Sequence, residues 1–264
     1  MFFAIPFPNI DPVLIEFGQI GSFPIAVRWY GLLWVVGCIG AWWNVNRYFS
    51  GTSNKIEKKY IDDFLIWGIL ATVIGGRLGY FIFYSEDNFN FFQIWLGGLS
   101  FHGGLAGVIF AMLLFTRRYS ISFWLFSDAI ACSAPIGLFT VRIANFINGE
   151  LYGRISDLPW AMVFPAGGLS SRLPSQLYEA FFEGLVLFGI LYYFSKKASL
   201  SERPGTLTGI FLVGYSIARG IIENFRQPDA HLGLLAGGLT MGQWLSFPVL
   251  CFGILLIIFA RPFK

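Results

Sequence analysis

Long apolar stretches alternate with short polar segments along almost the whole chain. Seven of the apolar stretches are long enough to cross about 30 Å of hydrocarbon, which takes roughly 20 residues of helix. The pattern therefore predicts an all-α integral membrane protein with seven transmembrane helices. The predicted spans are residues 25–49, 62–84, 99–115, 123–140, 176–194, 207–225 and 241–260.

Two segments outside these spans differ from the rest of the chain. Residues 1–24 carry prolines at positions 6, 8 and 12, which exclude a long helix, so we expect an aromatic-rich segment at the membrane interface. No basic residue precedes Arg28, so the segment lacks the charged region of a cleavable signal peptide. Residues 142–175 are rich in glycine, proline and polar residues, which predicts an outward-facing loop or small head between the fourth and fifth helices. We find no internal repeat or linker and treat residues 1–264 as a single polytopic membrane domain.

The composition agrees with a membrane protein. Of 264 residues, 56% are hydrophobic, 19% are aromatic and only 12% are charged, and the mean hydropathy is +0.65. A soluble globular chain has about 25% charged residues. These values exclude a disordered chain, a coiled coil and a nucleic-acid-binding protein. Cys38, Cys132 and Cys251 lie far apart in apolar runs, which is typical of packing residues rather than of a disulfide framework or a metal site.

The positions of the charges predict an orientation in the membrane. Most basic residues follow the first, third, fifth and seventh spans, whereas residues 85–98, between the second and third spans, hold Glu86 and Asp87 and no basic residue. By the positive-inside rule, the N-terminus is outside and the C-terminus is cytoplasmic. The basic residues predicted to be cytoplasmic are Arg47, Lys55, Lys58, Lys59, Arg117, Arg118, Lys196, Lys197, Arg203, Arg261 and Lys264.

The remaining seven basic residues are all arginine and lie within the spans or on the predicted outer side. A charge near the bilayer centre costs at least ~2.5–3.5 kcal/mol, and a guanidinium group suits bidentate binding of phosphate or carboxylate. Ion pairing with the intramembrane acids Asp128, Glu179, Glu183 and Glu223 is a reasonable interpretation for Arg28 and Arg77 taken singly but not for the whole set. The arginines are Arg28, Arg77, Arg142, Arg154, Arg172, Arg219 and Arg226.

Two short polar groups lie at the predicted outer ends of the first and third spans. In residues 28–31, Tyr30 is either an interfacial anchor or a ligand contact. In residues 100–104, His102 stands beside two glycines, so a ligand can come close to it; a satisfied core histidine is the alternative. We expect the second histidine, His231, to be solvated in an outer loop.

Glycine clusters suggest close helix contacts. Gly75, Gly76 and Gly79 are spaced as in helices that pack closely, and packing is our interpretation for them. The similar cluster that begins at Gly103 and Gly104 follows His102, so a role beside a ligand stays open for it.

A third polar group covers residues 141–154. If the fourth helix extends into this group, Arg142 and Asn145 share one face, and Gly149 then ends the helix. Gly153 allows a second tight turn. The composition suits the headgroup of an anionic lipid. The other polar members are Asn148, Glu150 and Arg154.

A fourth polar group lies on the sixth span. Its residues are spaced i, i+4, i+8 and i+11, which places them on one helix face. Arg219 and Glu223 alone would make a plain ion pair, but such a face deep in lipid must point into a polar cavity. The four residues are Tyr215, Arg219, Glu223 and Arg226.

Residues 141–154 resemble the signature of the prolipoprotein diacylglyceryl transferases of bacterial inner membranes, G-R-I-G-N-F-I-N-G-E-L-x-G-R, with Val141 and Ala144 replacing two glycines. Leu173 stands where the family often carries a histidine, so a mechanism that uses this second histidine is unavailable. The resemblance spans nearly the whole chain and implies the same seven helices with an outside N-terminus. The other matches, in family order, are RWYG at 28–31, FHGG at 101–104, PSQLYE at 174–179 and RGIIENFRQPD at 219–229.

The resemblance implies a multi-pass protein of the bacterial inner membrane. Such an enzyme transfers the sn-1,2-diacylglyceryl group of phosphatidylglycerol to the lipobox cysteine of a prolipoprotein signal peptide, giving a thioether and glycerol-1-phosphate. His102, Arg142 and Arg219 are the implied catalytic residues. The implied substrate-binding residues are Tyr30, Gly103, Gly104, Asn145, Asn148, Glu150, Gly153, Arg154, Tyr215, Glu223 and Arg226.

The residues fit this chemistry. A free thiol has a pKa of about 8.5, so the site must supply a base or a positive field. His102 is the available base, and Arg142 or Arg219 alternatively lowers the thiol pKa directly. Guanidinium groups would stabilise the charge that the phosphate gains as its C–O bond breaks, so no metal or organic cofactor is needed.

Two other classes of function fit the sequence less well than the transferase. A lipid or anion transporter would show two related halves, and none is found. A structural scaffold would not gather arginine, histidine and asparagine on the outer side.

Overall fold

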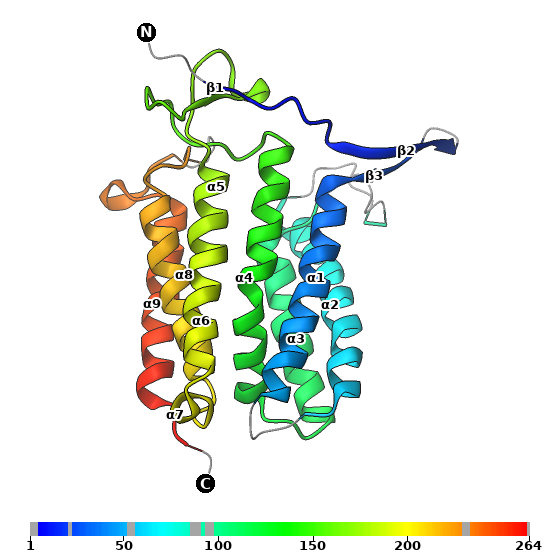
Figure 1. The fold of residues 1–264 in the computed structure, drawn as a ribbon, viewed down its shortest axis with the longest axis vertical. Helices are drawn as coiled ribbons and strands as arrows, with labels where there is room; N and C mark the ends of the chain where they lie inside the picture. Colours follow the sequence, from blue (N-terminus) through cyan, green and yellow to red (C-terminus); the bar gives the residue numbers. More distant parts are fainter. Residues whose placement is uncertain are drawn as a thin grey trace.

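The computed structural model describes residues 5–20, 23–51, 56–84, 91–92, 98–228 and 233–262. Within these residues, seven helical segments run side by side along the long axis of the molecule (Figure 1). The bundle consists of α1 (Trp29–Ser50), α2 (Lys58–Tyr84), α3 (Phe101–Arg118), α4 (Phe123–Ile147), a continuous fifth segment, α8 (Thr206–Ile222) and α9 (Met241–Phe259). The fifth segment joins α5 (Ser175–Glu179), the π-helix η3 (Ala180–Val186) and α6 (Leu187–Ser195), and α7 (Ala198–Ser201) follows it.

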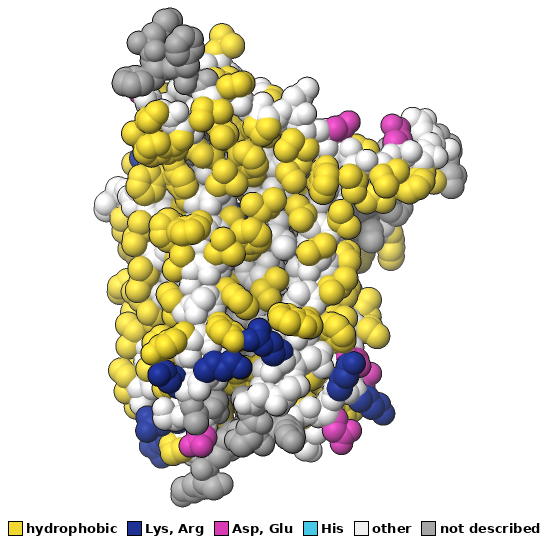
Figure 2. Space-filling model, in the orientation of Figure 1, with side chains coloured by type: hydrophobic (Ala, Val, Ile, Leu, Met, Phe, Trp, Pro, Cys, Tyr) yellow, Lys and Arg dark blue, Asp and Glu magenta, His cyan; other side chains and the backbone are white. Residues whose placement is uncertain are grey.

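The surface of the bundle is that of a membrane protein. On the face shown in Figure 2, hydrophobic side chains cover the middle of the molecule and charged side chains gather toward its ends. Four of the described helical segments are both long and apolar enough to cross a membrane. These four are Lys58–Phe83, Phe123–Ile147, Ser175–Ser195 and Met241–Phe259.

The helix bounds differ from the predicted spans mainly in two places. The first helix begins at Trp29 rather than at residue 25, because residues 23–28 pair with another strand. The fourth continues to Ile147 instead of ending at residue 140, so Arg142 and Asn145 lie on its last turns, as the sequence suggested. Gly149, with a φ of 65°, then allows the chain to turn away from the helix axis.

The N-terminal segment corrects the all-α prediction. The strands β2 (Val13–Ile20) and β3 (Phe23–Arg28) form an antiparallel hairpin, and β1 (Ile5–Pro6) pairs in parallel with β4 (Met162–Val163). The hairpin projects sideways from the end of the bundle that carries β1 (Figure 1). Prolines prevent a helix here, and pairing two extended strands satisfies backbone groups that would otherwise lack partners.

The segment between α4 and α5 forms a small head at the same end (Figure 1). Isolated strand pairings join Gly153 to Arg226 and Ile155 to Arg172. The short helix η2 (Pro165–Gly167) lies in sequence between Ile155 and Arg172. The head therefore ties the end of α4 to the chain that leaves α8.

Helices α2 and α3 pack through glycine on both sides. A Cβ on Gly79 would lie 2.8 Å from the Gly103 Cα, and a Cβ on Gly75 would lie 3.0 Å from the Gly107 Cα. The structure confirms the packing interpretation for the first glycine cluster. It gives Gly103, in the second cluster, the same close contact with α2.

Asp128 connects α4 to the start of α8. Its fully buried carboxylate, on α4, accepts hydrogen bonds from the backbone N–H groups of Gly205 and Thr208, at 2.9 and 2.7 Å, and from the Thr208 hydroxyl at 2.7 Å. These donors lie at the N-terminus of α8, where a negative charge is favoured. Asp128 thus caps a neighbouring helix instead of pairing with an arginine.

Candidate active site

Six charged side chains from three helical segments converge at the head end of the bundle. Arg142 comes from α4, Glu179 and Glu183 come from the segment that contains the π-helix, and Arg219 comes from α8. Glu223 and Arg226 follow α8 directly. We call this set the arginine–glutamate cluster.

Glu179 is the centre of the cluster. Its carboxylate is fully buried and lies 3.1 Å from the Arg142 Nε, 3.1 Å from the Arg226 Nη1 and in direct contact with the Arg219 Nη1. Three guanidinium groups therefore surround one carboxylate. Such a buried charge is stable only because its partners are charged and closely placed.

Glu183 lies between the two arginines of α4 and α8 but makes weaker contacts. Its oxygens are 3.8 Å from the Arg142 Nη2 and 3.9 Å from the Arg219 Nη1. The side chain is fully buried, and neither oxygen has a hydrogen-bond partner within the described residues. A buried carboxylate oxygen without a donor is costly, so this position has unused capacity to accept a hydrogen bond.

The π-helix sets the position of these two glutamates. It spans Ala180–Val186, immediately after Glu179, and short π segments inside α-helices occur frequently at functional sites. Gly184 brings this segment against α4, because a Cβ there would lie 2.7 Å from the Phe139 Cβ. The close approach carries Glu179 and Glu183 to Arg142.

The arginines of the cluster remain accessible. The side chains of Arg142, Arg219 and Arg226 keep 15%, 14% and 11% of their surface exposed. Arg219 also pairs with Glu223 at 2.9 Å, so the i,i+4 ion pair exists within a larger set of contacts. With three guanidinium and three carboxylate groups, the cluster is close to electrically neutral when all six are ionised.

A second hydrogen-bond network extends the cluster toward the head. The Asn145 and Asn148 side-chain amides both donate to Glu150 Oε1, at 2.9 and 3.2 Å, and Arg142 donates to Asn145 Oδ1 at 3.4 Å. The Gln176 amide donates to the Glu150 backbone carbonyl at 2.6 Å. The structure therefore links Asn145, Asn148 and Glu150, three members of the third predicted polar group, to Arg142.

Tyr30 and Tyr215 also lie near these groups. Tyr30, at the start of α1, is close enough to Glu150 and Arg142 to interact with their charges. Tyr215, one turn before Arg219 on α8, is within reach of Glu183 and Arg219.

Arg226 corrects one part of the fourth predicted group. Helix α8 ends at Ile222, so Arg226 lies beyond the helix and not on its face. It reaches Glu179 from the segment that pairs with Gly153. Gly153 is required there, since a Cβ would lie 2.5 Å from the Phe225 carbonyl oxygen and 2.8 Å from that of Leu173.

His102 is joined to the cluster by no hydrogen bond or ion pair among the described residues. It occupies the first turn of α3, its ring is exposed and packs edge-on against Phe101, and it makes no hydrogen bond or ion pair to any described residue. Helix α3 packs mainly against α2 and also contacts α4. Gly104 is buried beside Thr72 of α2. His231 lies outside the described residues.

Three of the other predicted arginines donate hydrogen bonds to neutral groups. Arg154 donates to the Arg226 carbonyl at 3.0 Å, and Arg77 donates to the carbonyls of Phe91 and Gly98 at 2.8 and 3.0 Å. Arg172 donates to the Gly167 carbonyl and to the Gln227 side chain. Arg28 is exposed at the end of β3.

Ion pairing, which we rejected for the whole set of arginines, is therefore correct for Arg142, Arg219 and Arg226. Glu179 and Glu183 were not among the predicted site residues. One signal for them was available, because two carboxylates spaced i,i+4 on an apolar span are expensive unless they face a polar site.

The arrangement is suited to binding a phosphate group. Guanidinium N–H groups bind tetrahedral anions with strong charge-assisted hydrogen bonds, and the carboxylates beside them can accept protons. Among the described residues, no three histidine, cysteine, aspartate or glutamate side chains are grouped as metal ligands.

Comparison with known proteins gives one consistent family. Residues 13–259 match the family model described as prolipoprotein diacylglyceryl transferase. Among similar proteins are the phosphatidylglycerol–prolipoprotein diacylglyceryl transferases of Rhodospirillum rubrum, 49% identical over 100% of this chain and 97% of that protein, and of Shewanella oneidensis, 47% identical over 98% of each. The relative from Allorhizobium ampelinum is 46% identical over 99% of this chain and 93% of its own length.

Proposed function

The chain belongs to the prolipoprotein diacylglyceryl transferase family, and from this membership we propose that the arginine–glutamate cluster is where it does its chemistry. The protein is a multi-pass membrane enzyme that transfers the diacylglyceryl group of phosphatidylglycerol to prolipoproteins. We further propose that the acceptor is the lipobox cysteine thiol of the signal peptide, and that a thioether and glycerol-1-phosphate are the products.

One observation carries the assignment of the site. Arg142 and Arg219, from helices far apart in sequence, meet at the buried carboxylates of Glu179 and Glu183 and stay partly exposed. Arginines so placed can bind the lipid phosphate and stabilise the charge that it gains as the glycerol C–O bond breaks. In this proposal Arg142 and Arg219 are catalytic. Arg226 and Glu223 line the region in which the lipid phosphate binds.

The remaining binding roles follow from the second network. Asn145, Asn148 and Glu150 offer amide and carboxylate groups to the glycerol hydroxyls of the headgroup. We place Tyr30, Tyr215 and Arg154 around this headgroup. Gly103, Gly104 and Gly153 contribute through their close packing against α2, Phe225 and Leu173, which positions the groups that contact the lipid.

Two groups can accept the thiol proton. His102 is the base expected from the family resemblance, and its exposure leaves it open to a substrate. Glu183 is the acceptor inside the cluster, since both of its oxygens lack a hydrogen bond within the described residues. The balanced step is the same for either group: the base takes the thiol proton, sulfur bonds to the glycerol carbon, and the phosphate leaves with the bonding electrons.

The proposed placement in the membrane has seven spans. We propose that α1 and α3 cross the bilayer with the four long apolar helices and α8, in the bacterial inner membrane, with the N-terminus outside and the C-terminus cytoplasmic. The head at residues 142–175 then faces outward, and residues 1–24 lie at the outer interface as part of the same domain. Support comes from Figure 2, in which Lys and Arg gather at the end opposite the head.

A reconstituted assay tests the function directly. The purified protein is incubated with phosphatidylglycerol and a lipobox peptide, and mass spectrometry follows the peptide. We expect a covalent diacylglyceryl adduct on the cysteine, and a peptide with serine in place of that cysteine is the matched control. If no adduct forms on the cysteine peptide although phosphatidylglycerol is present, the proposed acceptor is wrong.

A further inference from the structure

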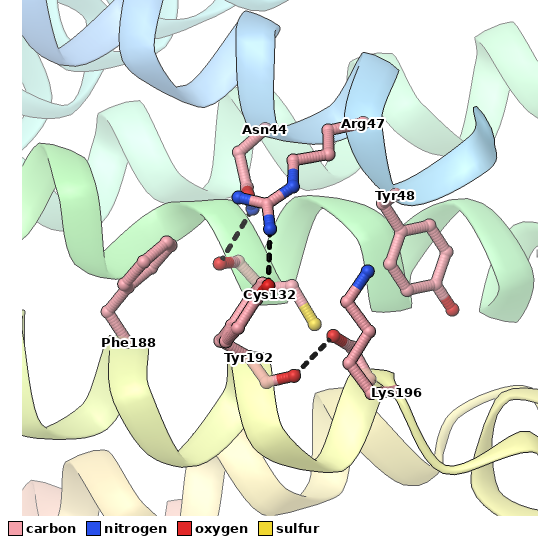
Figure 3. Close-up of a pocket in the computed structure, with 8 residues that line it drawn as sticks. Asn44, Arg47, Tyr48, Cys132, Phe188, Tyr192 and Lys196 are labelled. Carbon is pink, nitrogen blue, oxygen red and sulfur yellow. Dashed lines mark hydrogen bonds between the residues drawn. The ribbon is translucent and has the colours of Figure 1, made fainter. Parts of the chain in front are cut away.

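A recess at the end of the bundle opposite the head lies between α1, α4 and α6 (Figure 3). Asn44, Arg47 and Tyr48 line it from α1, and Tyr192 and Lys196 line it from the end of α6. Cys132, on the α4 wall, precedes Arg142 by ten residues, or about 15 Å of helix, so the recess is separate from the arginine–glutamate cluster.

Two cations at this recess have no acidic partner among the residues that the structure describes. The six ion pairs within the described residues all belong to the arginine–glutamate cluster, and none involves Arg47 or Lys196. Arg47 is half-buried, which makes an uncompensated charge there more costly than on an open surface. An anion at the recess would compensate part of this positive charge.

The Tyr192 ring positions both cations. The Arg47 guanidinium lies 4.6 Å from its centroid and donates to its hydroxyl, and the Lys196 Nζ lies 5.4 Å from the same centroid. A cation–π contact holds a positive group in place without neutralising it. Arg47 uses one of its five N–H donors on Tyr192 and keeps others for a ligand.

The walls add fixed polar groups. The Asn44 side chain is only 7% exposed, and its amide nitrogen donates to the Cys132 carbonyl at 3.2 Å and to the Ser133 hydroxyl at 3.0 Å. The Tyr48 hydroxyl is buried and has no hydrogen-bond partner within the described residues. The hollow measures about 20 Å³, enough for one oxygen-sized group to enter while the rest of a ligand sits at the mouth.

We propose that this recess binds the phosphate of an anionic phospholipid in the leaflet at the basic end of the bundle. Basic pockets between membrane helices at this depth bind lipid phosphates, and Trp43 and Tyr192 are exposed beside the recess, as expected for side chains at the headgroup level. Arg47 supplies the bidentate contact and Lys196 supplies a point charge. The site goes beyond the proposed function and does not depend on which face of the membrane it occupies.

Native mass spectrometry with titrated lipid tests the proposal. The double variant Arg47→Gln/Lys196→Gln is compared with the wild-type protein and with Lys197→Gln. Lys197 is a matched control because it is the next residue, is exposed and lies 4.7 Å from the ring of Tyr193, outside the recess. Lipid held at the arginine–glutamate cluster is common to all three proteins and cancels in the comparison.

We expect the double variant to lose one retained phosphatidylglycerol or cardiolipin, with an affinity about 10- to 100-fold lower, while Lys197→Gln binds as the wild type does. Phosphatidylcholine retention should be the same in all three. If inorganic phosphate competes with the lipid, the phosphate group alone is the ligand. If it does not compete, the whole lipid is required. Either result supports the site.

Equal retention in the double variant, or an equal loss in Lys197→Gln, would overturn the proposal. Transfer activity at saturating phosphatidylglycerol should remain near wild type in the double variant, which shows that it is folded. If it does not fold, the single Lys196→Gln variant at this exposed position provides the same comparison. Failure of this site would leave the proposed transfer reaction untouched, because that is read from the peptide adduct.

Discussion

At the scale of single residues, the cluster places two guanidinium groups on a shared pair of carboxylates. Arg142 and Arg219 each contact Glu179 and Glu183, so neither arginine is held by one partner alone. Removing one of them leaves buried carboxylates partly uncompensated and, under the proposed mechanism, also removes a donor to the substrate phosphate.

We expect Arg142→Ala and Arg219→Ala each to reduce transfer by at least ~10²–10³-fold, the usual loss for one such donor, while the protein still inserts. Arg142→Lys should also be poor, because lysine lacks the bidentate fork. The measurement is adduct formation per amount of membrane-inserted protein. Arg117→Ala, at the exposed end of α3, is the control. Near-normal turnover in either alanine variant would remove phosphate stabilisation as the role of the cluster.

The proton acceptor gives a prediction about pH. If His102 is the base, His102→Gln should slow transfer by ~10²–10⁴-fold, and the loss should shrink at alkaline pH as the thiol ionises by itself near pH 8.5. Lipid binding should be kept. The measurement is a rate–pH profile of this variant beside one of Glu183→Gln.

The two profiles separate the alternatives. Alkaline rescue confined to Glu183→Gln would move the base from His102 to Glu183. Profiles parallel to the wild type in both variants would exclude a side-chain base and leave ionisation of the thiol to the arginines.

At the scale of elements, close contacts of glycine determine how the helices pack. In α2, a Cβ on Gly75 would overlap the Gly103 carbonyl and lie 3.0 Å from the Gly107 Cα. In α6, Gly189 has open space around the same position. Alanine normally favours a helix over glycine by up to about 1 kcal/mol, so the two sites should respond with opposite sign.

We expect Gly75→Ala to destabilise the protein by about 1–3 kcal/mol, because α2 and α3 must move apart. Gly189→Ala should be neutral or slightly stabilising. Thermal unfolding in detergent measures both. A melting temperature for Gly75→Ala at or above that of Gly189→Ala would contradict the close packing of these helices.

The helices could be predicted from the sequence because each apolar run is long and bounded by charged or turn-forming residues. The hairpin could not, since residues 13–28 are too apolar for an alternating pattern to show. The π-helix could not be predicted either, because it changes the backbone hydrogen bonds from i→i+4 to i→i+5, and the spacing of apolar residues does not show this change. The cluster was recognised only in part, because the partner of a charge depends on how helices pack, and Arg226 reaches Glu179 from outside its helix.

At the scale of the whole molecule, the Lys and Arg side chains that gather on the face shown in Figure 2 lie at the end of the bundle opposite the head (Figures 1 and 2). A reporter enzyme fused after Lys197 should therefore read as cytoplasmic, and one inserted near Gly168, an exposed position of the head, should read as outside. The opposite result at either position would reverse the proposed orientation and place the cluster at the wrong face.

The near-neutral charge of the cluster has a consequence for product release. Phosphatidylglycerol brings one negative charge, whereas the departing phosphate monoester carries about 1.5 to 2 near neutral pH. A site made only of arginines would hold this product more tightly than the substrate and would be inhibited by it. Under the proposed mechanism, Glu179 and Glu183 would compete with the product for the same guanidinium groups, so each ion pair that re-forms would help to displace the glycerol phosphate and to empty the enzyme for the next lipid.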